Sequence, residues 1–290
     1  MTTAGGQAAP RRVLLDTDIG GDIDDAWALA FLLRSPELAL VGVTTVTGDA
    51  AGRAKLAVKL CDIAGRSDIP VAAGYGFETP EQPQLRFSAD YTKRAPLNEH
   101  AVDFIIRTLR AEKEPLTIVP IGPLANIAEV LQRAPELKPK IAEIVAMAGS
   151  AFCGYGAGTL PCAEYNVAQN AAAAQVVFSS GVPITMVPLD CTWMLQPSAE
   201  QLQALAASKD PLAQAVAELT KLWPGRVPTL FDVAAVWACF DRSQMAEHPL
   251  RIVVDGGGYT RVTEGKPNTT AVLGIDRAAL LEVCLQRLMP

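Results

Sequence analysis

Ten residues near the N-terminus concentrate side chains that could do chemistry. The stretch DTDIGGDIDD, residues 16–25, directly follows the apolar run Val13-Leu14-Leu15. Its aspartates are Asp16, Asp18, Asp22, Asp24 and Asp25. Carboxylates this close repel one another unless a cation holds them together. Ca²⁺ and Mg²⁺ prefer oxygen ligands and would neutralise such a cluster, and an aspartate beside the ion could act as a base toward a bound water.

Two other interpretations explain the aspartate run less well. Aspartates favour the first turn of a helix, but that accounts for one or two acids and not for five in ten residues. An EF-hand loop also has alternating acids. However, it follows a helix and needs a glutamate at its twelfth position, where this chain has Trp27. We therefore expect a carboxylate-rich cation site at the end of a strand, where the glycines let the backbone turn sharply.

The composition argues against several other classes of function. The chain has 290 residues, of which 50% are hydrophobic and 19% charged, so it can bury a sizeable core. A net charge of −6 without a lysine and arginine cluster argues against nucleic-acid binding. No apolar run approaches the roughly 20 residues of a membrane span. Six scattered cysteines fit reduced thiols in the cytoplasm, and two histidines are too few for a three-histidine zinc site.

Short apolar runs alternate with helical patterns, which is typical of βαβ units and a mostly parallel sheet. We expect a flexible tail over residues 1–10 and a single α/β domain over residues 11–290, whose central sheet is flanked by helices. The C-terminal third adds a helical insertion and a small β addition. Strands are expected at 13–15, 40–46, 69–73, 116–121, 141–147, 183–189, 251–254, 260–264 and 271–275. Helices are expected at 24–33, 53–64, 98–113, 124–133, 171–179, 199–207, 211–222, 230–240 and 277–288.

The aspartate run resembles the N-terminal signature of the nucleoside hydrolases, the calcium-dependent N-ribohydrolases of the inosine-uridine preferring type. That signature is an Asp-x-Asp pair, a short turn with glycine, and an Asp-Asp pair that opens a helix. The corresponding residues here are Asp16, Asp18, Asp24 and Asp25. The turn has five residues, 19–23, where members with Pro-Gly have three. Asp22 therefore competes with Asp24 for the role of the first acid in the pair.

Later segments resemble the same family in the same order, so that the resemblance covers the whole chain. They are VTTVTGD (43–49), IVPIGPLAN (118–126), AEYN (163–166), MVPLD (186–190) and FDVAAVWA (231–238). The resemblance implies a calcium site whose ligands are Asp18, Asp25, the backbone carbonyl of Ile121, and Asp232. It also implies that Asp18 is the general base, which takes a proton from a metal-bound water.

The remaining site residues would bind the substrate or support the ligands. Asp24, Glu164 and Asn166 would bind ribose hydroxyls. Asp49 would contact the sugar or simply cap a loop, and Trp193, after a strand end, would stack on the base or belong to the core. Asp16 and Asp22 would orient the ligand acids from behind. The two histidines, His100 and His248, are expected to make local hydrogen bonds only.

The activity implied is hydrolysis of the N-glycosidic bond of a small-molecule ribonucleoside to ribose and free base, through an oxocarbenium-like state. The family also implies a place in nucleoside catabolism and salvage, and a homodimer or homotetramer. Phe231 departs from the pattern, because many members carry there a histidine proposed to protonate the leaving base. That departure keeps open a nucleoside- or ribose-binding protein without catalysis.

A phosphohydrolase of the haloacid dehalogenase type is a second alternative. It also begins with a strand followed by Asp-x-Asp and uses Mg²⁺. The immediate Asp24-Asp25 pair and Glu164 have no place in that class.

Overall fold

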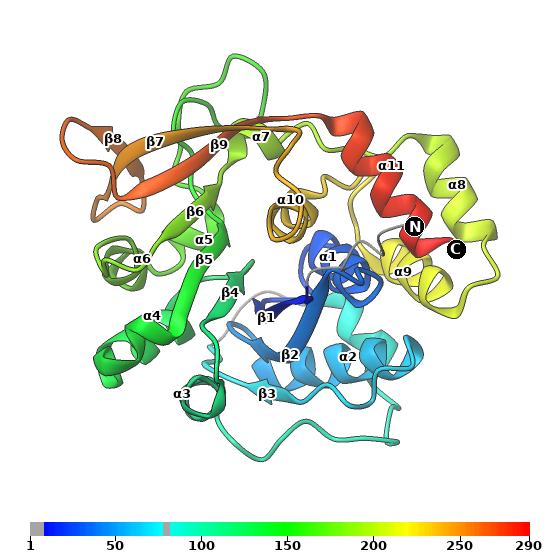
Figure 1. The fold of residues 1–290 in the computed structure, drawn as a ribbon. Coiled ribbons are helices and arrows are strands. Elements are labelled where there is room, and N and C mark those ends of the chain that lie inside the picture. The colour runs from blue at the N-terminus through cyan, green and yellow to red at the C-terminus, as the bar shows by residue number, and fades with distance from the viewer. Residues whose placement is uncertain (1–8, 78–81) are drawn as a thin grey trace, which may run out of the picture.

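The computed structural model describes residues 9–77 and 82–290, which build a nine-stranded sheet in the order β3-β2-β1-β4-β5-β6-β9-β7-β8. The strands from β3 to β9 in that order pair in parallel, and β7 and β8 continue the edge antiparallel (Figure 1). The strands are β1 (Arg11–Thr17), β2 (Leu38–Thr45), β3 (Val71–Ala73), β4 (Leu116–Pro120), β5 (Ile141–Met147), β6 (Ile184–Val187), β7 (Met245–Val254), β8 (Thr260–Thr263) and β9 (Thr269–Ile275).

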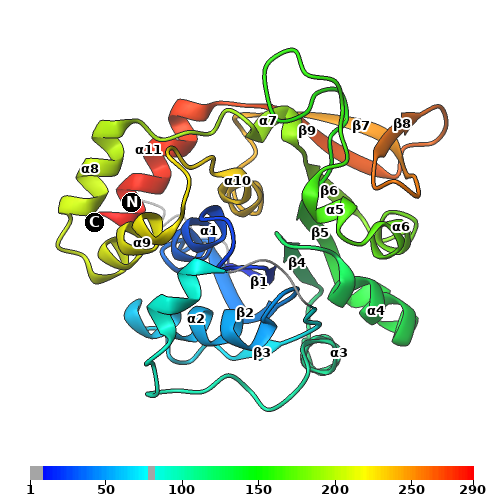
Figure 2. The ribbon, with the colours of Figure 1, turned by 180° about the vertical axis from the view of Figure 1, so that it is seen from behind.

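Helices cover both faces of this sheet. α3, α4 and α6 lie on one face, and α1, α2, α9, α10 and α11 lie on the other, with α8 packed outside them (Figures 1 and 2). The α-helices are α1 (Asp24–Leu33), α2 (Ala50–Ile63), α3 (Ala101–Ala111), α4 (Ala125–Arg133), α5 (Tyr165–Ala168), α6 (Ala171–Phe178), α7 (Leu189–Thr192), α8 (Ala199–Ala207), α9 (Pro211–Leu222), α10 (Phe231–Ala238) and α11 (Arg277–Leu288). Two 3₁₀ helices are η1 (Pro83–Ser88) and η2 (Pro135–Lys140). No helix among the described residues is long and apolar enough to span a bilayer.

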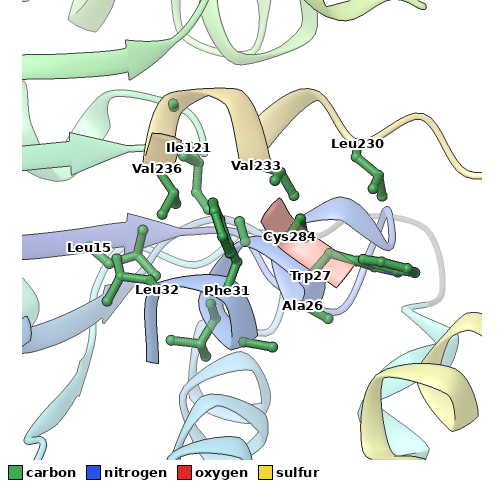
Figure 3. Packing of buried hydrophobic residues seen from close by; sticks show 14 of the residues in the cluster. Leu15, Ala26, Trp27, Phe31, Leu32, Ile121, Leu230, Val233, Val236 and Cys284 are labelled. Atoms are coloured by element: carbon green, nitrogen blue, oxygen red, sulfur yellow. The ribbon is translucent and has the colours of Figure 1, made fainter. Parts of the chain in front are cut away.

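The apolar sequence of α1 explains its place in the centre of one layer. Trp27 and Phe31 are fully buried, and most of the helix is apolar on every side, as in helices that are covered all round. Figure 3 shows these side chains beside Val233 and Val236 of α10. The packing brings the first turn of α1 against the first turn of α10, although about 200 residues separate them in the chain.

The topology places one crevice at the centre of the sheet. β1 lies between β2 and β4. After β1 the chain adds β2 and β3 on one side of it, and then crosses to the other side to add β4, β5 and β6. In open α/β sheets such a reversal leaves a ligand-binding crevice outside the carboxyl ends of the strands. Asp18 follows the end of β1 and Ile121 follows the end of β4, so both lie at this crevice.

The fold confirms the expected α/β class with a mostly parallel sheet. The predicted bounds of α1, β5, α8, α9 and α11 agree with the structure residue for residue. The short helices α5, α7, η1 and η2 were not predicted. The sequence predicted a small β addition in the C-terminal third. Its last strand, β9, instead belongs to the main sheet, because it pairs in parallel with β6. Of the tail expected over residues 1–10, residues 1–8 lie outside the described part of the chain.

Candidate active site

A cavity of about 350 Å³ opens at the central crevice. Its wall brings together the ends of β1, β4 and β5, the starts of α1 and α10, and the loop that follows β5. The lining residues are Asp18, Gly21, Asp22, Asp24, Asp25, Arg53, Ile121, Met147, Tyr155, Glu164, Tyr165, Asn166, Phe231 and Asp232. Most of the residues that the sequence predicts for the site therefore meet in one place.

Three buried carboxylates form the centre of the acidic wall. Asp24, Asp25 and Asp232 each offer an oxygen within 4.8 Å of the others. The carboxyl groups of Asp24 and Asp232 lie close enough to share a proton. Asp25 accepts a hydrogen bond from the hydroxyl of Thr17. Asp24 and Asp25 lie in the first turn of α1, which no side chain caps, and both line the cavity. The cluster could hold a metal ion.

Burial raises the pKa of the acids in this wall, and the charges of neighbouring acids raise it further for Asp24, Asp25 and Asp232. Burial is the largest cause for Asp24, Asp25 and Asp232, followed by the charges of their neighbours, and raises each pKa well above its ordinary value. The pKa of Asp18 rises to about 6. Acids in this condition are stabilised by binding either protons or a cation. An all-oxygen donor set fits a hard divalent ion.

The backbone carbonyl predicted as a metal ligand lies at the same cavity. The Ile121 oxygen accepts a hydrogen bond from the side-chain amide of Asn166 at 3.0 Å. A carbonyl oxygen has two lone pairs, so one remains for a further partner. Gly122 lets the chain after β4 pass close to the chain after β1, because a Cβ at residue 122 would stand 2.8 Å from the backbone nitrogen of Asp18.

Arg53 is a cation of the cavity wall that was not predicted from the sequence. Its side chain is buried, and it donates to the carbonyl oxygens of Ile19 at 2.8 Å and Thr47 at 3.0 Å. Its charge lowers the pKa of Asp18 and Asp25 against the effect of burial. The only signal in the sequence is that Arg53 lies about one helical turn after Asp49, where a solvent-facing arginine would be equally natural.

The five-residue turn after β1 is held by side chains from other parts of the chain. Gly20 has a φ of +110°, a conformation that glycine adopts readily. Gln84 from η1 is fully buried, and its amide donates to the carbonyls of Gly21 at 2.8 Å and Asp22 at 2.7 Å. This turn brings the Asp22 side chain to the cavity beside Asp24, so both candidates for the first acid role line it.

Glu164 and Asn166 are positioned by the short helix α5. Glu164 caps this helix, and its two carboxylate oxygens accept hydrogen bonds from the backbone N–H groups of Gly149 and Asn166 at 2.8 and 2.7 Å. Burial raises the pKa of Glu164 to about 7 despite those bonds. The amide nitrogen of Asn166 donates to Ile121 and Met147, which leaves its carbonyl oxygen as an acceptor for a ligand.

Three of the predicted site residues do not line the cavity. Asp16 is fully buried below it, where it accepts hydrogen bonds from Thr44 at 2.5 Å and Asn126 at 2.8 Å, and burial raises its pKa to about 7. Asp49 is exposed and caps α2 through the N–H of Gly52, which is the loop-cap alternative. Trp193 is half-buried at the end of α7.

Aromatic side chains form another part of the cavity wall, and two of them were not predicted. Tyr155 and Phe231 pack edge to face, with ring centroids 6.0 Å apart and an angle of 84°. Tyr165, which follows Glu164, completes this wall. His100 caps α3 through its Nδ1, which is the local role expected of it. His248 lies in β7, and neither histidine lines the cavity.

Fold and cavity together define an α/β protein with a carboxylate site suited to a divalent cation and to a small polar ligand with a flat group. Comparison with known proteins makes the class specific. Residues 13–282 match the model of the family described as inosine-uridine preferring nucleoside hydrolase. The chain belongs to this family, whose members hydrolyse the N-glycosidic bond of ribonucleosides, and the resemblance seen in the sequence is confirmed.

Individual relatives agree over nearly the whole chain. The pyrimidine-specific ribonucleoside hydrolase RihA of Escherichia coli O1:K1 is 31% identical over an alignment of 320 positions, covering 95% of this chain and 97% of RihA. The plant nucleoside hydrolase PpNRh1 has a TM-score of 0.83 at 26% identity, covering 97% and 99% of the two chains. A purine-preferring ribonucleoside hydrolase from Gardnerella vaginalis has a TM-score of 0.80 at 26% identity, covering 96% and 98%.

Proposed function

We propose that this protein hydrolyses ribonucleosides to ribose and free base with Ca²⁺ as its cofactor. The observation that carries the proposal is the convergence of buried acids from two distant helices, α1 and α10, at one cavity. The ion would be held by Asp18, Asp25, Asp232 and the Ile121 carbonyl, with Asp24 close enough to Asp25 and Asp232 to share in binding. When bound, calcium would neutralise these acids and orient a water and the ribose hydroxyls.

Asp18 is the general base in this proposal. In the cation-free protein burial raises its pKa to about 6, and a bound cation would lower that pKa, so that Asp18 is ionised and can accept a proton at neutral pH. Arg53 keeps that pKa from rising further by its charge. As water attacks the anomeric carbon, Asp18 takes the water proton, and the surrounding carboxylates stabilise the positive charge that develops on the ribosyl group.

The ribose would be oriented by groups that are already fixed in place. The carbonyl oxygen of Asn166 is left to accept a hydrogen bond from the ribose, because the amide nitrogen already donates to Ile121 and Met147. Asp24 and Glu164 line the same cavity and would accept hydrogen bonds from ribose hydroxyls. Asp16 would support β1 and β2 from behind the site through its bonds to Thr44 and Asn126.

A nucleoside panel tests this proposal. We would incubate the protein with purine and pyrimidine ribonucleosides and with p-nitrophenyl riboside, in calcium or in chelator, and measure ribose and free base by chromatography. The panel spans both base classes because RihA is named for pyrimidines and the Gardnerella relative for purines. We expect calcium-dependent release. A folded protein that turns over no substrate would refute the proposal, and tight binding without product would indicate a nucleoside-binding protein.

The variant Asp18→Asn tests the assignment of the base. We expect kcat/KM to fall at least about a hundredfold, on the order of general-base effects, with little change in fold. The matched control is Asp68→Asn, because Asp68 is exposed and pairs with Arg66 away from the cavity. Wild-type kcat/KM in Asp18→Asn would show that another group activates the water.

We also propose the setting that the family implies for such an activity. The enzyme would act in nucleoside catabolism and salvage in the cytoplasm, as a homodimer or homotetramer. Light scattering on the purified protein tests the assembly, and a monomeric mass at micromolar concentration would refute that part.

A further inference from the structure

The cavity lacks the leaving-group histidine that the sequence resemblance leads one to expect. Phe231 stands at that position, and neither histidine of the chain lines the cavity. A base that departs with the bonding electrons becomes negatively charged, and the nearby carboxylates make that charge costly. A neutral hydrogen-bond donor on the aromatic wall would remove part of this cost.

Tyr155 has the geometry of such a donor. It comes from the loop between β5 and α5, its ring packs edge to face with Phe231, and it lines the cavity. Its hydroxyl oxygen accepts a hydrogen bond from the backbone N–H of Tyr165 at 3.1 Å. No group among the described residues accepts the hydroxyl proton, so that proton is available to a ligand.

We propose that Tyr155 is the leaving-group residue of this enzyme: its O–H donates a hydrogen bond to a ring nitrogen or carbonyl oxygen of the departing base. The inference rests on the proposed nucleoside hydrolysis and deepens it. Tyr155 thereby performs, from the loop between β5 and α5, the function that Phe231 cannot perform. The substrates it favours are nucleosides whose base presents an acceptor at the edge facing this loop.

Tyr165 is the other hydroxyl on this wall, and it is the weaker candidate. Its side chain makes no hydrogen bond with any described residue, so nothing fixes the direction of its hydroxyl. The hydroxyl of Tyr155 is held by the backbone of α5, the same helix that carries Glu164 and Asn166. Fixed donors stabilise developing charge better than mobile ones, because they need no reorganisation during the reaction.

The reaction balances with this residue as a donor. The water oxygen bonds to the anomeric carbon while the carbon–nitrogen bond breaks, and the electron pair of that bond stays on the base. The water proton goes to Asp18 and later to solvent. The base leaves hydrogen-bonded to Tyr155 and takes its proton from solvent. Partial burial and the charge of Glu164 raise the pKa of Tyr155 above its ordinary value, so the hydroxyl stays neutral as a donor should.

The test compares leaving groups that differ in their need for a donor. Wild type and Tyr155→Phe are assayed with inosine, uridine and p-nitrophenyl riboside; p-nitrophenolate is a good leaving group without any proton. The ring of phenylalanine keeps the contact with Phe231, so the fold is preserved and is checked by thermal melting. We expect kcat for at least one of the nucleosides to fall about a hundredfold, and that for p-nitrophenyl riboside to fall less than about threefold.

The matched control is Tyr75→Phe, because the Tyr75 hydroxyl donates to Glu129 away from the cavity. It should leave all three rates within about twofold of wild type. An equal loss on all substrates in Tyr155→Phe would overturn the inference, since the hydroxyl would then position the sugar. Unchanged rates on all substrates would overturn it as well. If wild type hydrolyses none of the three, the proposed function itself fails, and the inference with it.

Discussion

Replacing Asp232 by asparagine should change stability in opposite directions with and without calcium. The carboxylate oxygens of Asp24, Asp25 and Asp232 lie within 4.8 Å of one another, and two unit charges at that separation repel by about 3–4 kcal/mol at an effective dielectric constant of about 20. Part of this cost is avoided by raising the pKa values, so we expect the calcium-free variant to gain about 1–3 kcal/mol in free energy of unfolding. The new amide would also donate to Asp24.

Calcium should stabilise the wild type and not the variant. An ion that binds only the folded state adds about 2.7 kcal/mol at a concentration of 100 times its Kd. For a chain of this size such a gain raises Tm by about 4–8 °C. Asp232→Asn removes one charged ligand of the proposed site. We therefore expect its Tm to rise by less than about 2 °C under the same calcium concentration.

The assay is thermal unfolding followed by calorimetry or circular dichroism, in chelator and in increasing calcium. Asp68→Asn is the control, because it removes one aspartate from an exposed pair with Arg66 and should retain the wild-type response. The reasoning is refuted if Asp232→Asn is less stable than wild type in chelator and keeps the full calcium response. That result would mean that Asp232 stabilises the fold without a cation.

Further predictions concern the groups around the acidic cluster. Without calcium, the free energy of unfolding should fall as pH rises from about 4 to about 7, because acids whose pKa is raised by folding lose stability as they ionise. Burial raises the pKa of Asp16 to about 7, of Asp18 to about 6 and of Glu164 to about 7. Urea unfolding across this pH range would measure the fall. Arg53→Met should shift the acid limb of the kcat/KM profile to higher pH, because Arg53 lowers the pKa of Asp18; Arg53→Lys should shift it less, and identical profiles would contradict this role. Gln84→Leu should cost about 1–3 kcal/mol in urea unfolding, because two turn carbonyls lose a buried donor.

The sequence was sufficient for the parts of the fold that local pattern controls. The largely apolar helix α1 could be bounded from the sequence, whereas the strand expected at 13–15 extends over Arg11–Thr17. The acids after β1 pointed to a site at the strand ends. Parallel strands align their carboxyl ends along one edge of the sheet, so residues at different strand ends were expected to meet there. That geometry depends on topology and not on side-chain detail.

Residues whose role depends on distant partners could not be found this way. Gln84 lies in a turn-rich segment, and only the structure shows its amide bound to the turn after β1. Arg53 resembles an ordinary helix residue until its carbonyl partners are known. Asp49 is the opposite case, a residue predicted for the site that has a local role. It follows a strand and matches a family motif, but in this structure it caps the helix α2 that begins directly after it.

The charge of the cavity connects the acidic wall with the aromatic one. Among the described residues, the acids that line it are Asp18, Asp22, Asp24, Asp25, Glu164 and Asp232, and Arg53 is the one cation. Even a bound divalent ion leaves this wall negative if the acids are ionised. Such a wall favours the cationic ribosyl group but disfavours the anionic base that leaves it. The same electrostatics that promotes bond cleavage therefore requires a donor directed at the base, and the aromatic wall supplies one in the hydroxyl of Tyr155.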